Sequence, residues 1–193
     1  QTGTVAIGAD ALGALTSGTE NLAIGYQAGL AITTGINNVA VGKGAMIDVV
    51  EGQNNIAIGR QAFGGLLDTT ADASVGNIFI GTDAGGGAWV TAVSNYNIGI
   101  GMNALDAAMN GALNNVAIGK SSMSAVTTAN NNVAVGFNSL ATAQTAQLNV
   151  AIGSNSLDAL TYNGNSFNTA VGYDSGTELV GGTSNTIVGA YAG

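Results

Sequence analysis

Side chains that could do acid/base or nucleophilic chemistry are few in this 193-residue chain, which contains no His and no Cys. Asp68 and Asp72 share a loop, but closeness in sequence alone does not make an acid/base pair. The glycine-rich segment 81–87 lacks the Lys and the following helix of a phosphate-binding loop. The Asp-rich nonapeptide of calcium-binding β-rolls is also missing. We therefore expect no catalysis, no cofactor and no metal site.

Aromatic side chains are the better candidates for recognition. Trp89 and Tyr96 belong to segment 85–96, and Tyr162 belongs to segment 158–167. An exposed Trp or Tyr beside Asn and Asp is typical of a carbohydrate platform, which makes these three residues candidate surface contacts. In the alternative interpretation, Trp89 caps a local hydrophobic cluster or packs on a neighbouring chain.

Composition and charge narrow the class of protein. Charged residues make up 7% of the chain, Gly is 31 of 193 and aromatics are 5%, so the apolar residues available are mostly Ala, Val and Ile. Such a chain can fill only a narrow core. Three cations, Lys43, Arg60 and Lys120, against 11 acidic residues give a net charge of −8. This balance argues against a nucleic-acid partner and against a polybasic membrane surface, and it favours a soluble extracellular protein.

Two further absences limit the interpretation. Without Cys there is no disulfide framework, so the sequence does not indicate a redox compartment. No apolar run reaches the roughly 18 residues that span a bilayer, and we expect no membrane insertion.

The elements that must position these side chains come from an internal repeat. A five-residue motif ending in Gly occurs eleven times, at Gly8, Gly25, Gly42, Gly59, Gly81, Gly101, Gly119, Gly136, Gly153, Gly172 and Gly189. The first four glycines are evenly spaced, and the basic unit has about 17 residues. Some units are longer, and their extra residues are expected to form loops at one edge, at segments 64–76, 85–96 and 158–167.

The motif columns predict a β-strand. Ile or Val precedes every motif glycine, and the residue two positions earlier is aliphatic in nine copies, with Thr169 and Thr186 as the exceptions. A small residue, mostly Ala, lies between them. This alternation is typical of a strand with one buried face, and it predicts that Ile58 and Ile118 are fully buried. The glycine predicts a sharp corner with φ > 0 or a close backbone approach, and an Ala or Ser three residues later predicts a second short strand or corner.

The first motif position is Thr4 in the first copy and Asn in the other ten. These are Asn21, Asn38, Asn55, Asn77, Asn97, Asn115, Asn132, Asn149, Asn168 and Asn185. Stacked parallel coils would bring identical amides about 4.8 Å apart, close enough to hydrogen-bond in a ladder. The structural interpretation is an internal Asn ladder that caps a turn. The functional alternative is a row of ligand-binding amides.

The predicted fold is therefore all-β: a parallel β-solenoid of eleven coils of about 17 residues, forming a single domain over residues 1–193. Eleven coils at about 4.8 Å each give a rod of roughly 50 Å. The first coil begins abruptly and the last is unfinished at Gly193. We expect the ends to be covered, by flanking domains or by end-to-end stacking of copies into a filament.

The motif N-x-A-[IV]-G-x-x-[AS] resembles the head repeats of trimeric autotransporter adhesins. It is also similar to the N-T-A-[IV]-G-Y-x-[AS] repeats of phage tail fibres and related bacterial surface proteins, which residues 168–173 match together with Ser175. The resemblance covers residues 4–192. It implies a left-handed parallel β-roll, three chains side by side, and a role in adhesion or fibre building. Composition also favours a trimer, since we expect Ala surface on the outside of a narrow coil to require a partner.

Together these observations predict a structural or adhesive segment of an extracellular fibre, on a cell or virion surface, that is not an enzyme. The expected partners are other copies of the chain, as a homotrimer or an end-to-end filament, and a cell-surface glycan or protein receptor. The alternative is an ice-binding or glycan-binding solenoid. Against ice binding, the chain has no repeated T-x-T column, and its Thr pairs occur in turns of only some coils.

Overall fold

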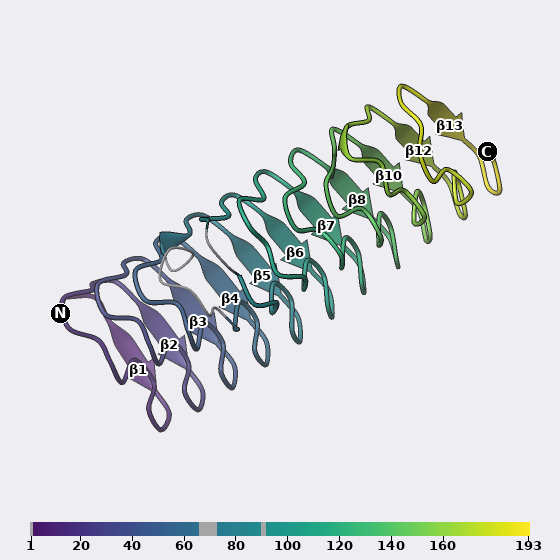
Figure 1. The fold of residues 1–193 in the computed structure, drawn as a ribbon. Helices are drawn as coiled ribbons and strands as arrows, with labels where there is room; N and C mark the ends of the chain where they lie inside the picture. The colour runs from purple at the N-terminus through teal and green to yellow at the C-terminus, as the bar shows by residue number, and fades with distance from the viewer. Residues whose placement is uncertain (1, 66–72, 90–91) are drawn as a thin grey trace.

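The computed structural model, which describes residues 2–65, 73–89 and 92–193, is a rod of stacked coils (Figure 1). Each motif contributes one three-residue strand to a single 11-stranded parallel sheet, in which the motif strands follow one another in sequence order. These strands are β1 (Val5–Ile7), β2 (Leu22–Ile24), β3 (Val39–Val41), β4 (Ile56–Ile58), β5 (Ile78–Ile80), β6 (Ile98–Ile100), β7 (Val116–Ile118), β8 (Val133–Val135), β10 (Val150–Ile152), β12 (Thr169–Val171) and β13 (Thr186–Val188). The predicted parallel β-solenoid is confirmed, with about ten coils of some 17 residues.

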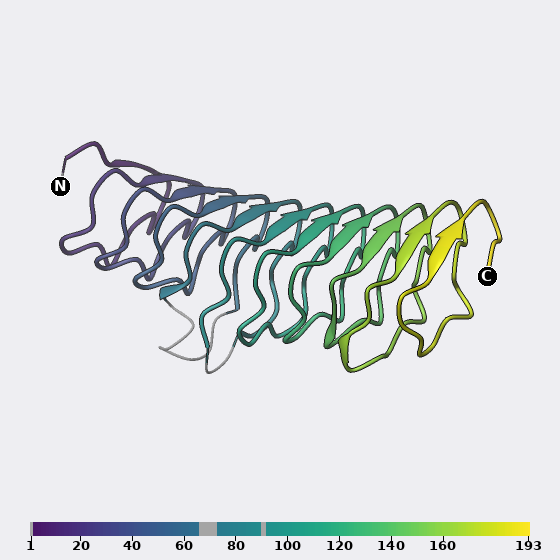
Figure 2. The ribbon, with the colours of Figure 1, turned by 90° about the horizontal axis from the view of Figure 1, so that it is seen from above.

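Each motif strand pairs with the next in register, residue for residue. Ile56 lies opposite Ile78 across one of the longer repeat units, and Val150 lies opposite Thr169 across another. The sheet therefore continues through the longer units without a shift. Viewed from above, the sheet lies along one side of the rod and the connecting loops along the other (Figure 2). A second sheet on the loop side consists of β9 (Ala146–Gln147) and β11 (Gly164–Asn165), which pair in parallel.

The orientation of the motif strands is opposite to the predicted one. Ile58 and Ile118 are 39% and 37% exposed, whereas the alanines beside them, Ala57 and Ala117, are completely buried. From β2 to β12 the middle residue of every motif strand is buried and its two neighbours are half-buried or exposed. The prediction of a buried Ile/Val column was wrong, and so was the expected Ala surface on the outside.

The reason is the width of the coil. The Ser three residues after a motif glycine reaches across the core and donates a hydrogen bond to a carbonyl of the motif strand in the next coil. Ser139 Oγ lies 3.0 Å from the carbonyl oxygen of Ala151, and Ser122 and Ser156 make the same contact with Ala134 and Ala170 at 3.2 Å. Walls this close leave room for a methyl group between them but not for a branched side chain, so Ile and Val must point outward.

Larger apolar side chains fill the core nearer the loops. The fourth residue after the motif glycine is a buried Leu, Met or Phe in several coils, as in Met46, Leu105 and Met123, each with φ near 51°. A second buried row includes Ile32, Val49, Val126 and Leu160. The segment that was predicted as a second strand or corner is a corner, built from turns.

The motif glycines meet both conditions expected of a tight corner. Their φ angles lie between 128° and 144° in all eleven copies. In the first ten, an added Cβ would lie 2.1–2.7 Å from the carbonyl oxygen of the motif glycine in the next coil. Any side chain at this position would therefore separate the coils.

Two strands depart from the small middle residue: β13 carries the half-buried Ile187 at the end of the rod, and β5 carries an aromatic ring inside it. Phe79 occupies the middle position of β5, and Gly99, its partner in β6, leaves space for the ring. A Cβ on Gly99 would lie 2.8 Å from Phe79 Cδ1. The ring packs on Phe63 and Trp89, with centroid distances of 5.2 and 5.7 Å, in the part of the rod where the repeat units are longest.

This pairing predicts that Gly99→Ala destabilises the rod by about 1–3 kcal/mol, the usual cost of overpacking a core. The same substitution should cost less in a Phe79→Ala background, because the ring that it clashes with is gone. Denaturant unfolding of the wild type, both single variants and the double variant gives the coupling energy. A coupling near zero would show that Phe79 and Gly99 do not share this space.

Candidate binding surfaces

The ten motif asparagines form a ladder inside the rod. Asn115 shows the typical contacts: its Oδ1 accepts from the backbone N and the Nδ2 of Asn132, both at 3.1 Å, and its Nδ2 donates to Asn97 Oδ1 at 3.0 Å. The same Nδ2 also donates to the carbonyl of Ala129, in the turn before the next motif, at 2.7 Å. The asparagines from Asn21 to Asn168 are at most 1% exposed. The structural interpretation is confirmed: from Asn21 to Asn168 the amides are buried and bonded to one another or to turn carbonyls, which leaves no exposed row of amides to bind a ligand.

The ladder continues through the longer units. Asn77 Nδ2 donates to Asn55 Oδ1 at 3.2 Å across the longest unit. The side-chain link between neighbouring asparagines is replaced at one step, from Asn149 to Asn168. There Asn149 Oδ1 accepts from Ser166 Oγ at 2.8 Å and from the backbone N of Asn168 at 3.0 Å. Extra residues are thus accommodated without a break in the ladder.

Removing one amide should break the ladder locally. Asn115→Ala leaves the two donors of Asn132 without an acceptor and the carbonyl of Ala129 without a donor. Each buried group left unsatisfied costs about 1–3 kcal/mol, so we expect the free energy of unfolding to fall by more than about 2 kcal/mol. The control is Asn163→Ala, which removes an exposed Asn outside the ladder. Equal losses in the two variants, measured by denaturant unfolding, would contradict this assignment.

The outer face of the sheet is a long apolar surface. It consists of the first and third residues of the motif strands, which are Ile, Val or Leu except at Thr169 and Thr186. Ile7 and Val188 are 57% and 69% exposed at the two ends. A strip about 50 Å long and about 10 Å wide covers on the order of 500 Å². Contiguous apolar patches of this size on soluble proteins are commonly interaction sites.

A mixed row of cations and large apolar residues runs beside this face, at the position after each motif glycine. It holds all three cations of the chain, and its large members are Tyr26, Lys43, Arg60, Met102, Lys120, Phe137 and Tyr173. Lys43 Nζ lies 5.9 Å from the ring centroid of Tyr26, and Lys120 Nζ lies 6.0 Å from that of Phe137. Sequence reasoning missed this row, although aligning the units on their glycines places its members in one column.

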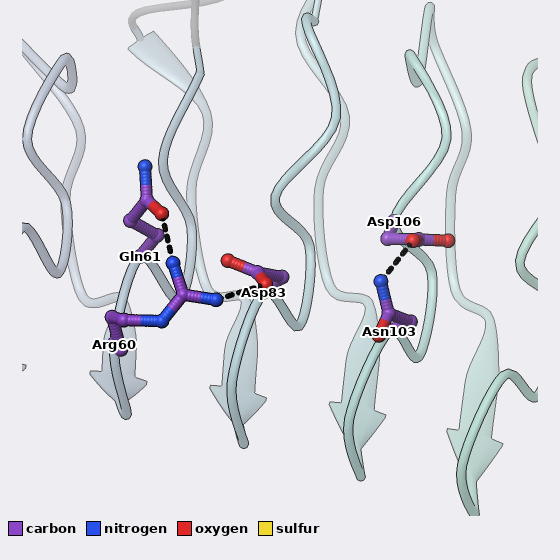
Figure 3. A network of polar contacts seen from close by, with 5 residues as sticks. All are labelled: Arg60, Gln61, Asp83, Asn103 and Asp106. Carbon is purple, nitrogen blue, oxygen red and sulfur yellow. Dashed lines mark hydrogen bonds and ion pairs between the residues drawn. The ribbon is translucent and has the colours of Figure 1, made fainter.

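The one ion pair between described side chains belongs to this row. Arg60 binds Asp83 of the next coil at 2.6 Å and also contacts Gln61, while Asn103 donates to Asp106 at 2.7 Å one coil further on (Figure 3). A cavity of about 200 Å³ lies between Lys43 and Arg60 and is also lined by Gln27, Gly44, Ile47 and Gln61. Because Asp83 offsets the Arg60 charge, this cavity has little excess positive charge to attract an anion.

The three candidate contact residues differ in their surroundings. Trp89 is completely buried, with its ring centroid 4.7 Å from that of Phe63, so its assignment as a surface contact was wrong and the alternative of a local hydrophobic cluster is confirmed. Tyr96 and Tyr162 are 60% and 37% exposed. They do not form one site, because Tyr96 precedes β6, Tyr162 follows β10, and β7 and β8 lie between those strands. Asp68 and Asp72 lie outside the described residues.

A groove on the loop side is lined in part by Thr161 and Asn163, the two sequence neighbours of Tyr162. It has a volume of about 410 Å³ and is lined by Ala125, Thr142, Gln144, Thr145, Thr161 and Asn163. These residues come from three successive coils, so the groove runs along the rod. β9 and β11 follow its lining residues directly and hold two of its loops together.

Asp158, in the same longer unit, carries a carboxylate in an unfavourable environment. Burial raises the pKa of its carboxyl above the ordinary 3.8, and the nearby negative charges of Asp174 and Glu178 add to the increase. Its Oδ1 is buried with no hydrogen-bond partner among the described residues. The same kind of desolvation raises the pKa of Asp106.

These pKa values predict a stability change with pH. The folded chain holds the Asp158 proton more tightly than the unfolded chain, whose pKa is near 3.8. The stability linked to that proton is therefore fully present below this pH and is lost as the pH rises through the folded-state pKa. Asp158→Asn should raise the Tm at pH 7, and the gain should vanish near pH 3. The exposed Asp10→Asn is the control, and a pH-independent difference in Tm would contradict the prediction.

Comparisons with family models, with curated proteins and with solved structures give no match to this chain. Within residues 2–65, 73–89 and 92–193, no three His, Cys, Asp or Glu side chains gather as metal ligands. The described part of the chain also contains no helix that is long and apolar enough to cross a membrane.

Proposed function

We propose that this chain is a structural segment of an extracellular fibre, without catalytic activity, that assembles side by side through the outer face of its sheet. The observation that carries the proposal is the orientation of the Ile and Val columns, which point away from the core along the whole rod. Burial of apolar surface is the main driving force of most protein association. A long face of this kind is the surface that another copy of the chain would cover.

The regular spacing of the face favours self-association over a globular partner. All coils rise by the same distance, so the side chains of one rod can interdigitate with those of a second rod along their full length. Three faces packed around a common axis would bury on the order of 1,500 Å² in total, or about 500 Å² for each pair of rods, so the assembly would depend on all three contacts together. The resemblance of the repeats to those of trimeric surface fibres is the reason for choosing three copies.

The mixed row suits the edge of such an interface. Interfaces commonly have an apolar centre and a polar, solvent-accessible rim. Lys43, Arg60 and Lys120 lie directly after the corner that ends the motif strand, beside the outer face. The charges would thus stay in water while Tyr26 and Phe137 add apolar surface next to them.

The alternative of an ice-binding solenoid is less well supported. The outer columns hold Thr only at Thr169 and Thr186, and their other members are aliphatic. An aliphatic array has no hydroxyl groups with which to hydrogen-bond water on that face. A thermal-hysteresis assay on the purified chain separates this alternative from the fibre.

Two neighbouring residues give a sharp test of the assembly. Ile118 lies on the outer face and Ala117 lies in the core. Ile118→Asp, combined with Ile58→Asp, should leave the β-structure intact but shift the mass in native conditions from three times 18.8 kDa to a single chain. Ala117→Asp should unfold its coil, because a carboxylate buried without a partner costs several kcal/mol.

Circular dichroism and native mass measurement distinguish the outcomes. Ile118→Val should retain both the fold and the assembly and is the matched control. A wild-type chain that is monomeric at micromolar concentration would refute the proposed assembly. Unfolding of the Ile58→Asp/Ile118→Asp variant as a single chain would show that the outer face stabilises the coil itself.

A further inference from the structure

The groove on the loop side has the properties of a small-ligand site. Its volume of about 410 Å³ lies within the usual range for such sites, roughly 300–1,000 Å³. It crosses three coils along the rod axis and so suits an extended ligand better than a compact one. Its lining residues belong to the loops, which run along the side of the rod away from the sheet (Figure 2). An assembly through the outer face of the sheet would therefore leave the groove open.

The polar groups of the groove are uncharged. The Thr142 hydroxyl donates to the carbonyl of Asp158, and the Thr161 hydroxyl donates to that of Val180 at 3.3 Å. Each hydroxyl proton is therefore engaged, and the oxygen lone pairs are left to accept a hydrogen bond from a ligand. The side-chain amides of Gln144 and Asn163 make no hydrogen bond within the described part of the chain, and each offers two donors and one acceptor. A ligand rich in hydroxyl groups, which both donate and accept, matches this set.

Charge narrows the ligand further. None of the lining residues is ionisable, and the chain as a whole carries −8, which disfavours anionic ligands. Tyr162 lies between Thr161 and Asn163 in the sequence and is 37% exposed, but it is not one of the residues that line the groove. The groove therefore offers uncharged hydrogen-bonding groups from successive coils.

The backbone around the groove is held in place. Gly164 pairs with Ala146 and Asn165 with Gln147, so the loops that carry Asn163 and Thr145 are joined by a short parallel sheet. Ser166 adds a hydrogen bond from its Oγ to the carbonyl of Gln147 at 3.2 Å. A site that is ordered before binding loses less conformational entropy when the ligand arrives.

We propose that the groove lined by Thr142, Gln144, Thr161 and Asn163 binds a neutral linear oligosaccharide, aligned along the rod. This inference goes beyond the proposed structural role, and repeated copies of the chain in a fibre would present several equivalent grooves. It does not depend on the number of chains in the assembly, because all of its residues belong to one chain.

The test is binding of the wild-type protein to an array of linear gluco-, manno-, galacto- and N-acetylglucosamine oligomers of two to six units, with sialylated and uronic-acid oligomers as charged probes. We expect binding to at least one neutral series. Thr161→Val and Asn163→Ala should each weaken it about tenfold, the effect of about 1.4 kcal/mol, and Gln144→Ala should weaken it too. The control is Thr16→Val, which removes the corresponding hydroxyl contact, to Thr33, at the other end of the rod.

Each outcome decides the matter. No neutral oligosaccharide bound, binding to acidic oligomers alone, or affinity unchanged in the three groove variants would overturn the inference. Native mass and melting temperature are measured for every variant, so that loss of assembly or of fold is separated from loss of the site. A chain that binds oligosaccharide but remains monomeric would leave the groove assignment standing and refute the side-by-side assembly instead.

Discussion

The short distance between the two walls of each coil is the constraint on which the rest of this structure depends. Where the Ser hydroxyl of one wall reaches the carbonyl of the other, only a methyl group fits between them. That limit places Ala inside and Ile or Val outside. It also means that the large ring of Phe79 requires Gly99 beside it in the next strand of the sheet. The composition of the chain, rich in Gly and Ala and poor in aromatics, follows from the same limit.

The Asn ladder makes the repeat tolerant of insertions. Because each amide bonds to its neighbour and to a turn carbonyl, it fixes the register of the next strand independently of the length of the loop between them. In the described part of the chain, an aromatic cluster lies where the longest units meet, and the uncharged groove, with its own small sheet, lies beside another longer unit. The ladder thus separates the part of the coil that must be constant from the part that can acquire a binding function.

The two long surfaces of the rod differ in chemistry, and each suits a different kind of contact. The sheet side is aliphatic and regular, with the three cations along its edge, and it suits contact with copies of the same chain. The loop side is polar, varied and shaped by the longer units, and it suits recognition of another molecule. A fibre built through the sheet side would leave the loop side free, so the two roles are compatible in one assembly.

The sequence by itself determined the strand positions, the parallel stacking, the corner glycines and the Asn ladder, because each recurs at a fixed place in eleven units. It could not decide which face of the strand is buried. Alternation of Ile with Ala, as in Ala117 and Ile118, shows that the two faces differ, but the choice between them depends on the distance to the opposite wall. Burial of Trp89, the compensation of Phe79 by Gly99 and the Thr-lined groove were likewise decided by the tertiary structure, since each depends on contacts between coils whose loops differ in length.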